Sequence, residues 1–132
     1  MITVLFACTH NAGRSQMAST FFNSMADPKM ARAISAGTEP ADHVHPEVVT
    51  AMREAGFDLA AAHPQRLTGD LASRASLLVT MGCGEACPVV PGAQREDWLL
   101  PDPKGQSLEQ VRAIRDDIRD RVQRLVEVQG WR

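Results

Sequence analysis

Short apolar runs alternate with segments of helical periodicity along the chain, and this order most restricts its fold. The runs Thr3–Ala7 and Ser76–Met81 have the length and composition of buried strands. Strands that alternate with helices are typical of doubly wound α/β domains, in which right-handed crossovers place helices on both faces of the sheet. We therefore expect residues 1–132 to form a single α/β domain with a four-stranded, mainly parallel sheet and helices on both faces.

Local signals predict the remaining elements. Arg32–Ser35 and Glu96–Leu100 are weaker strand candidates. Pro46 suits the first position of a helix, Thr68 suits an N-cap, and Ser107 with Gln110 forms a capping-box pattern. The predicted helices run from Arg14 to Met25, from Pro46 to Ala55, from Thr68 to Arg74 and from Ser107 to Gln129.

Composition excludes several classes of protein. The 132 residues are 44% hydrophobic and 23% charged, as in soluble globular proteins, and the net charge of −2 comes without a basic patch. No run approaches the roughly 18 apolar residues of a membrane span, and the first residues lack the pattern of a signal peptide. We therefore expect a cytoplasmic protein that binds neither nucleic acid nor membranes.

The segment from Cys8 to Ser15 is the strongest functional candidate. It lies between a predicted strand and a predicted helix, where proteins of this fold class bind ligands. Backbone N–H groups of such a loop and of the helix N-terminus can surround an oxyanion, and Asn11 and Gly13 tolerate the left-handed angles that such a loop requires. Arg14 adds a planar fork for two oxygens of a tetrahedral anion. The expected oxyanion-binding residues are Thr9, His10, Asn11, Ala12, Gly13, Arg14 and Ser15.

Cys8 is expected to act as a nucleophile at the bottom of this loop. The positive field of the loop favours the thiolate, which a bound oxyanion would meet in line for attack. Ser15 is expected to donate a hydrogen bond to the sulfur. The chain has neither the G-x-G-x-x-G pattern of dinucleotide sites nor the G-K-[ST] of nucleotide-phosphate loops. We interpret His10 as a solvent-facing residue, and His43, His45 and His63 form no informative pattern.

Three further residues are candidates outside the loop. Asp102 follows a predicted strand and Pro103 restricts its backbone, so its carboxyl could protonate a leaving oxygen, or the pair could form a simple turn. Cys83 follows the strand Ser76–Met81 and should share a sheet edge with Cys8, which permits Cys8–Cys83 and Cys83–Cys87 disulfides in turn. Alternatively, Cys83 and Cys87 are two inert thiols, or they form a zinc site with Cys8 and His10. The positive charge of Arg14 argues against a zinc site, because it would repel the cation.

These motifs together resemble those of the thioredoxin-coupled arsenate reductases of the low-molecular-weight protein tyrosine phosphatase fold. The matching segments are the loop Cys8–Ser15, SQMA at 15–18, SAG at 35–37, VTMGCGEACP at 79–88 and Asp97-Trp98 before Asp102-Pro103. The resemblance implies that Cys8 attacks arsenate, Asp102 protonates the departing oxygen, and Cys83 then attacks Cys8 to release arsenite. Cys87 next attacks Cys83, and thioredoxin reduces the Cys83–Cys87 disulfide; no bound cofactor is needed. The resemblance also implies a monomer, and phosphate or sulfate as competing anions.

Departures from the family pattern bear on the reductant, on metal binding and on the substrate. Only three residues separate Cys83 from Cys87, fewer than in many relatives, so glutaredoxin or a small thiol remains an alternative to thioredoxin. Some relatives bind potassium beside the loop. Asn11 and Ser35 match that site, but we align Ser19, Pro64 and Arg66 with its other ligands and predict no metal. The absence of aromatic residues after Asp102 favours a small inorganic anion over a phosphotyrosine as the substrate. The main rival function is that of a phosphatase.

Overall fold

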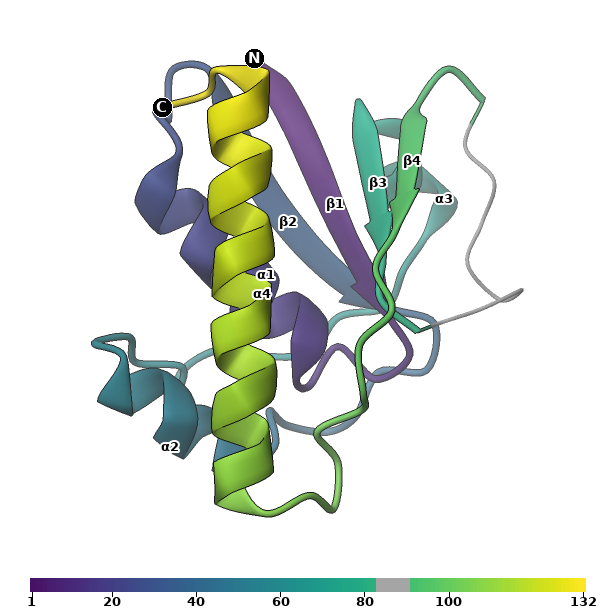
Figure 1. Cartoon of the computed structure of the whole chain (residues 1–132). Coiled ribbons are helices and arrows are strands. Elements are labelled where there is room, and N and C mark those ends of the chain that lie inside the picture. Colours follow the sequence, from purple (N-terminus) through teal and green to yellow (C-terminus); the bar gives the residue numbers. More distant parts are fainter. Residues whose placement is uncertain (83–90) are drawn as a thin grey trace.

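The computed structural model describes residues 1–82 and 91–132 of the chain. Its strands and helices follow one another in the order that the sequence predicts (Figure 1). In chain order they are β1 (Ile2–Cys8), α1 (Arg14–Met25), β2 (Ala31–Gly37), α2 (Pro46–Glu54), α3 (Gly69–Ser73), β3 (Leu77–Thr80), β4 (Gln94–Asp97) and α4 (Leu108–Gln129). Cys83 and Cys87 lie outside the described residues, so what the sequence predicts for them stays a prediction.

The four strands of the described residues form one parallel sheet in the order β2-β1-β3-β4. Successive side chains of β1 point to opposite faces, as the two-residue period of a strand requires. Val4 and Phe6 pack in a core with α1, α2 and α4, whereas Leu5 and Ala7 pack in a smaller core with Ala72 of α3. Figure 1 shows α4 and α3 on opposite sides of the sheet. The predicted doubly wound sheet with helices on both faces is therefore confirmed.

The parallel order brings the loops after β1 and β3 to the same edge of the sheet. The N–H of Met81 donates to the carbonyl of Ala7 at 2.7 Å, one residue beyond the paired part of β3. Gly82 follows at once, and the loop that starts at Cys8 leaves the sheet beside it. Segments about 75 residues apart in the sequence thus meet where ligands bind in this fold class.

β4 is shifted from its predicted position. The apolar pattern predicts a strand at Glu96–Leu100, whereas the strand runs from Gln94 to Asp97 and all its residues are exposed. The apolar residues that suggested a strand follow it instead: Trp98 packs against Phe6 with 5.7 Å between ring centroids, and Leu99 is 90% exposed. An edge strand does not need an apolar face on both sides, so the apolar pattern was a poor guide to its limits.

α4 begins and ends as the sequence predicts. Gln110 donates its N–H to Ser107 Oγ and accepts the N–H of Ser107, each at 3.2 Å, which completes the capping box. Gly130 ends the helix with a φ of 72°, in the left-handed region where glycine is unstrained. The apolar face of α4 is buried through Val111, Ile114, Ile118, Val122, Leu125 and Val126. No helix among residues 1–82 and 91–132 is both long and apolar enough to span a membrane.

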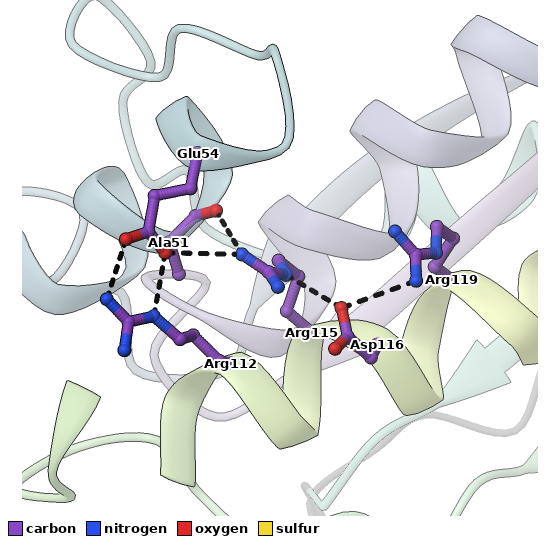
Figure 2. A network of polar contacts seen from close by, with 6 residues as sticks. All are labelled: Ala51, Glu54, Arg112, Arg115, Asp116 and Arg119. Carbon is purple, nitrogen blue, oxygen red and sulfur yellow. Dashed lines mark hydrogen bonds and ion pairs between the residues drawn. The ribbon is translucent and has the colours of Figure 1, made fainter. Parts of the chain in front are cut away.

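Ion pairs join the end of α2 to the first half of α4 (Figure 2). The guanidinium of Arg112 donates to both carboxylate oxygens of Glu54, at 2.8 and 2.7 Å. Arg115 donates to the carbonyl of Ala51 at 2.7 Å, which satisfies an acceptor in the last turn of α2, and it also contacts Asp116 at 2.9 Å. These contacts fix how α2 sits on α4.

We expect the contribution of Glu54 to stability to disappear in acid. The hydrogen bond from Arg112 lowers the pKa of Glu54 below its usual value of 4.5. The stabilisation is therefore complete above the unfolded-state pKa and is lost as the pH falls through the lower folded-state pKa. The Tm of Glu54→Gln should lie below that of the wild type near neutral pH, and the difference should shrink on acidification. A difference that stays constant with pH would contradict this account.

Candidate active site

Cys8 ends β1 with its side chain buried in the structure. The residue is 2% exposed, and its sulfur lies 2.8 Å from Ser15 Oγ and 3.3 Å from the backbone nitrogen of Asn11. Both contacts join the sulfur to the loop and helix that follow it in the sequence. The predicted contact between Ser15 and the sulfur is therefore confirmed.

The contacts of Asn11 leave the hydroxyl hydrogen of Ser15 available for the sulfur. Asn11 Oδ1 accepts the backbone N–H of Gln65 at 2.9 Å, so its Nδ2 must face the other way, toward Ser15 Oγ at 2.7 Å. Ser15 Oγ accepts that hydrogen bond and keeps its own hydrogen, which it donates to Cys8 Sγ when the sulfur is a thiolate. Two donors, the Ser15 hydroxyl and the Asn11 N–H, thus converge on the sulfur, and both stabilise a thiolate.

The loop turns its carbonyl groups outward. Each carbonyl from Cys8 to Gly13 accepts a hydrogen bond, the donors being the N–H groups of Thr38, Glu39, Ala41, His45 and Met17 and the side-chain amide of Gln16. A trans peptide points its N–H away from its C=O, so the following N–H groups are directed inward. Among the described residues, no acceptor contacts the N–H groups of Thr9, His10, Ala12 and Gly13. The loop is therefore an inward-facing set of donors suited to an oxyanion.

Asn11 and Gly13 serve the loop in different ways. Asn11 has a φ of 49°, in the left-handed region, as predicted. Gly13 has a φ of −147°, so the left-handed angle that a glycine tolerates is not used at this position. Close packing explains why this position is a glycine, because a Cβ here would lie 2.5 Å from the Cγ of Pro103. Gly13 thus lets the Asp102-Pro103 segment close over the loop.

Arg14 is the buried cation of the site. Its side chain is only 7% exposed, and its Nη1 donates to the carbonyl of Leu100 at 3.3 Å. Gly82, with a φ of 101°, packs so closely that a Cβ there would lie 2.1 Å from Arg14 Nη1. Arg14 is the first residue of α1, and its guanidinium is therefore held between the loop after β3 and the loop after β4.

Asp102 lies beside this guanidinium. Asp102 Oδ2 is 3.8 Å from Arg14 Nη2, and Oδ1 accepts the backbone N–H of Lys104 at 3.0 Å. Its side chain remains 43% exposed. Asp102 is thus fixed by a short turn at the mouth of the loop, where it can exchange protons with solvent and with a bound group.

His45 also lies at this mouth, although no sequence pattern pointed to it. Its backbone N–H donates to the carbonyl of Ala12 at 3.0 Å, and its ring approaches Gly13. Burial lowers the pKa of His45 below its usual value; the charge of Asp102 acts in the opposite direction, and those of His10 and Lys104 reinforce the lowering. These effects favour the neutral form of His45, which adds no charge to the site.

Gln65, and not Arg66, contacts Asn11 and Ser35 in the structure. Arg66 does not face these residues, because its guanidinium donates to the carbonyl of Thr38 at 3.2 Å. Gln65 contacts them instead, through its N–H to Asn11 Oδ1 and through Nε2 to the carbonyl of Ser35 at 2.8 Å. Gln65 directly precedes Arg66, the isolated bridge partner of Gly37, and is held there by the Gly37 N–H, which donates to its carbonyl at 2.9 Å. This contact could not be deduced from spacing alone.

The structure describes some of the remaining predicted residues and not others. His10 is half-buried and its Nδ1 lies 3.2 Å from the carbonyl of Glu39. Within residues 1–82 and 91–132, no three His, Cys, Asp or Glu residues lie close enough to hold a metal ion. Cys83 and Cys87 lie outside this part of the chain. Gly82, which precedes Cys83, accepts a hydrogen bond from Thr9 Oγ1 at 3.1 Å.

Comparison with known proteins agrees with this site. The family model for the low molecular weight phosphotyrosine protein phosphatases matches residues 3–129. A provisionally named arsenate reductase of Halobacterium salinarum is 42% identical over 121 residues, covering 89% of this chain and 85% of that protein. The glutaredoxin arsenate reductase of a Synechocystis species is 35% identical over 129 residues, covering 96% and 97%.

A solved structure shares both fold and sequence. The thioredoxin-dependent arsenate reductase of Corynebacterium glutamicum superposes with a TM-score of 0.84 and 36% identity, over 97% of this chain. This chain spans 61% of the length of that protein. The match over almost the whole chain, with a cysteine and an arginine in an inward-facing loop, confirms the resemblance seen in the sequence. The chain belongs to the low molecular weight phosphotyrosine protein phosphatase family, and arsenate reductases are among its relatives.

Proposed function

We propose that this protein reduces arsenate to arsenite at the loop between β1 and α1. The inward-facing N–H groups of the loop bind three oxygens of the anion, and the guanidinium of Arg14 contributes a planar pair of donors. Phosphate and sulfate have the same shape and compete for the loop. The thiolate of Cys8 lies beneath the bound anion.

The first chemical step forms a bond between sulfur and arsenic. The Cys8 thiolate attacks the arsenic, an As–O bond breaks, and Asp102 gives a proton to the oxygen that leaves as water. The two donors on the sulfur, from Ser15 and Asn11, maintain the thiolate before attack. The product is a covalent arseno-cysteine in which arsenic is still pentavalent.

In the second and third steps, the cysteines supply the two electrons that reduce arsenic and are themselves oxidised to a disulfide. The Cys83 thiolate attacks the sulfur of Cys8, the S–As bond breaks, and its electron pair stays on arsenic, which leaves as trivalent arsenite. Cys87 then attacks the sulfur of Cys83 in the Cys8–Cys83 disulfide and frees the Cys8 thiolate. An external dithiol reduces the resulting Cys83–Cys87 disulfide.

One observation carries this proposal beyond the shared phosphatase chemistry. Thr9, the residue after Cys8, donates a hydrogen bond to the carbonyl of Gly82, the residue before Cys83. The chain therefore enters the segment with the second and third cysteines from the rim of the nucleophile's loop. A phosphatase would need Cys8, Arg14 and Asp102 but neither Cys83 nor Cys87, so the two cysteines separate the candidate functions.

Thioredoxin is the reductant that we propose for the Cys83–Cys87 disulfide. The Corynebacterium glutamicum structure is that of a thioredoxin-dependent enzyme, whereas the Synechocystis relative is a glutaredoxin arsenate reductase. Only three residues lie between Cys83 and Cys87, and a short loop limits how far either sulfur can move. Glutaredoxin with glutathione is therefore the second reductant to test.

The test is a coupled assay that follows NADPH oxidation with arsenate and a thioredoxin system. The wild type should turn over repeatedly, whereas Cys83→Ser and Cys87→Ser should not. Both variants should keep the hydrolysis of an aryl phosphate, because that reaction does not use these sulfurs. Equal loss of both activities would contradict the relay, and activity with glutaredoxin alone would change only the reductant. Failure with both reductants, with aryl phosphate hydrolysis intact, would favour the phosphatase.

A further inference from the structure

Gln16 is a buried polar residue that the proposed reaction does not use. It is the third residue of α1 and only 7% exposed. Its Nε2 lies 3.1 Å from the carbonyl of Asn11, 3.2 Å from Asn11 Oδ1 and 3.3 Å from the carbonyl of His63. All three partners are acceptors, so the amide orientation of Gln16 is determined and Nε2 is the donor to each.

These contacts hold Asn11 in a conformation that it would not adopt freely. Asn11 is fully buried and has a positive φ, which costs free energy for a residue with a side chain. Gln16 donates to both the main-chain and the side-chain oxygen of Asn11 and so stabilises the backbone angle together with the orientation of the amide. The backbone N–H of Gln65 assists at Oδ1 alone.

The orientation of Asn11 reaches the reactive sulfur in two further contacts. Asn11 Nδ2 donates to Ser15 Oγ at 2.7 Å, and Ser15 lies 2.8 Å from Cys8 Sγ. The backbone N–H of Asn11 itself points to the sulfur at 3.3 Å. Both donors to Cys8 thus depend on Asn11, and Asn11 depends on Gln16.

We infer that Gln16 is a positioning residue for the nucleophile, which acts through Asn11 and Ser15 on the thiolate of Cys8. It touches neither the sulfur nor the anion-binding N–H groups, so its effect is indirect. Without its donor, Asn11 loses the hydrogen bond to its carbonyl and one of the two hydrogen bonds to Oδ1, so the amide that directs the Ser15 hydroxyl is held less firmly and the thiolate loses stabilisation. The inference rests on the proposed function, because it takes Cys8 as the nucleophile.

The test measures the reactivity of Cys8 directly. In a protein that carries Cys83→Ser and Cys87→Ser, Cys8 is the remaining cysteine, and its alkylation by iodoacetamide is followed as a function of pH. Gln16→Met keeps the length of the side chain and removes the donor. Gln16→Glu keeps the shape and replaces the donor by an acceptor with negative charge. Gln123→Met is the matched control, because Gln123 is an exposed residue of α4 whose amide contacts Glu127.

We expect the alkylation profile to move to higher pH in Gln16→Met, with about a tenfold lower rate near neutral pH, the effect of one lost buried hydrogen bond. Gln16→Glu should move the profile further, because its charge opposes the thiolate. The control should match the parent. Circular dichroism and Tm identify a variant that fails to fold, in which case the other variant carries the test.

The outcomes for Gln16 and for the proposed function can be separated. If folded Gln16→Met and Gln16→Glu keep the parent profile, the positioning role is overturned, even where Cys8→Ser is inactive. If the wild type reduces arsenate with neither thioredoxin nor glutaredoxin, the proposed function fails whatever the alkylation profiles show. A lower Tm with an unchanged profile would assign Gln16 a purely structural role and would also overturn the inference.

Discussion

Replacement of Cys8 by serine should lower arsenate reduction by at least about a thousandfold, because a neutral hydroxyl is a far weaker nucleophile than a thiolate. The polar groups around the sulfur, Ser15 Oγ and the N–H of Asn11, are arranged as donors. They stabilise a negative sulfur, but neither is a base that could activate a serine hydroxyl. The same substitution should abolish aryl phosphate hydrolysis, since both reactions begin with attack by Cys8.

Binding should survive this substitution. A serine side chain at this position can accept the same two hydrogen bonds, and the anion-binding N–H groups belong to the backbone. Cys8→Ser should therefore still show a rise in Tm with phosphate or arsenate, as expected for a ligand that binds only the folded state. Measurable turnover in this variant would contradict the role of Cys8, and loss of the Tm shift would show that the sulfur is needed to form the loop.

The parts of the site that were predicted from sequence are those that lie close together along the chain. Cys8, Arg14 and Ser15 fall between one strand and one helix, so local periodicity and residue type were enough to place them around a loop. Ser15 does contact the sulfur, and Asn11 does adopt a left-handed angle. The reason for Gly13 was not predicted, because it is close approach by Pro103, a residue 90 positions away.

The parts that were not predicted depend on the register of the sheet and on packing between distant segments. His45 and Gln65 reach the loop because the segments after β2 and α2 fold back over it, and nothing in their local sequence indicates this. Gly82 is required by the guanidinium of Arg14. Arg66 was expected beside Asn11, whereas Gln65 is the residue that contacts it. In an extended segment neighbouring side chains point to opposite sides, so a difference of one residue decides which of them reaches the loop.

Arg14→Lys should reduce kcat/KM for arsenate by roughly 100- to 1,000-fold, as expected for loss of a preorganised donor to a developing negative charge. The guanidinium is buried, contacts the carbonyl of Leu100 and lies against Gly82, so its plane is fixed before substrate binds. A lysine would keep the charge but could not offer two parallel donors to the anion. It would also be too short and too differently shaped to hold the Leu100 carbonyl and approach Asp102 together.

The matched control for Arg14→Lys is Arg66→Lys. Arg66 is exposed and its guanidinium contacts only the carbonyl of Thr38 among the described residues, so this variant should stay within about twofold of the wild type. Arsenate reduction and aryl phosphate hydrolysis should fall together in Arg14→Lys, because both reactions need the negative charge of the bound anion to be neutralised before Cys8 attacks. If Arg14→Lys kept near wild-type kcat/KM, the loop N–H groups alone would bind the anion, and the planar fork of Arg14 would have no role in catalysis.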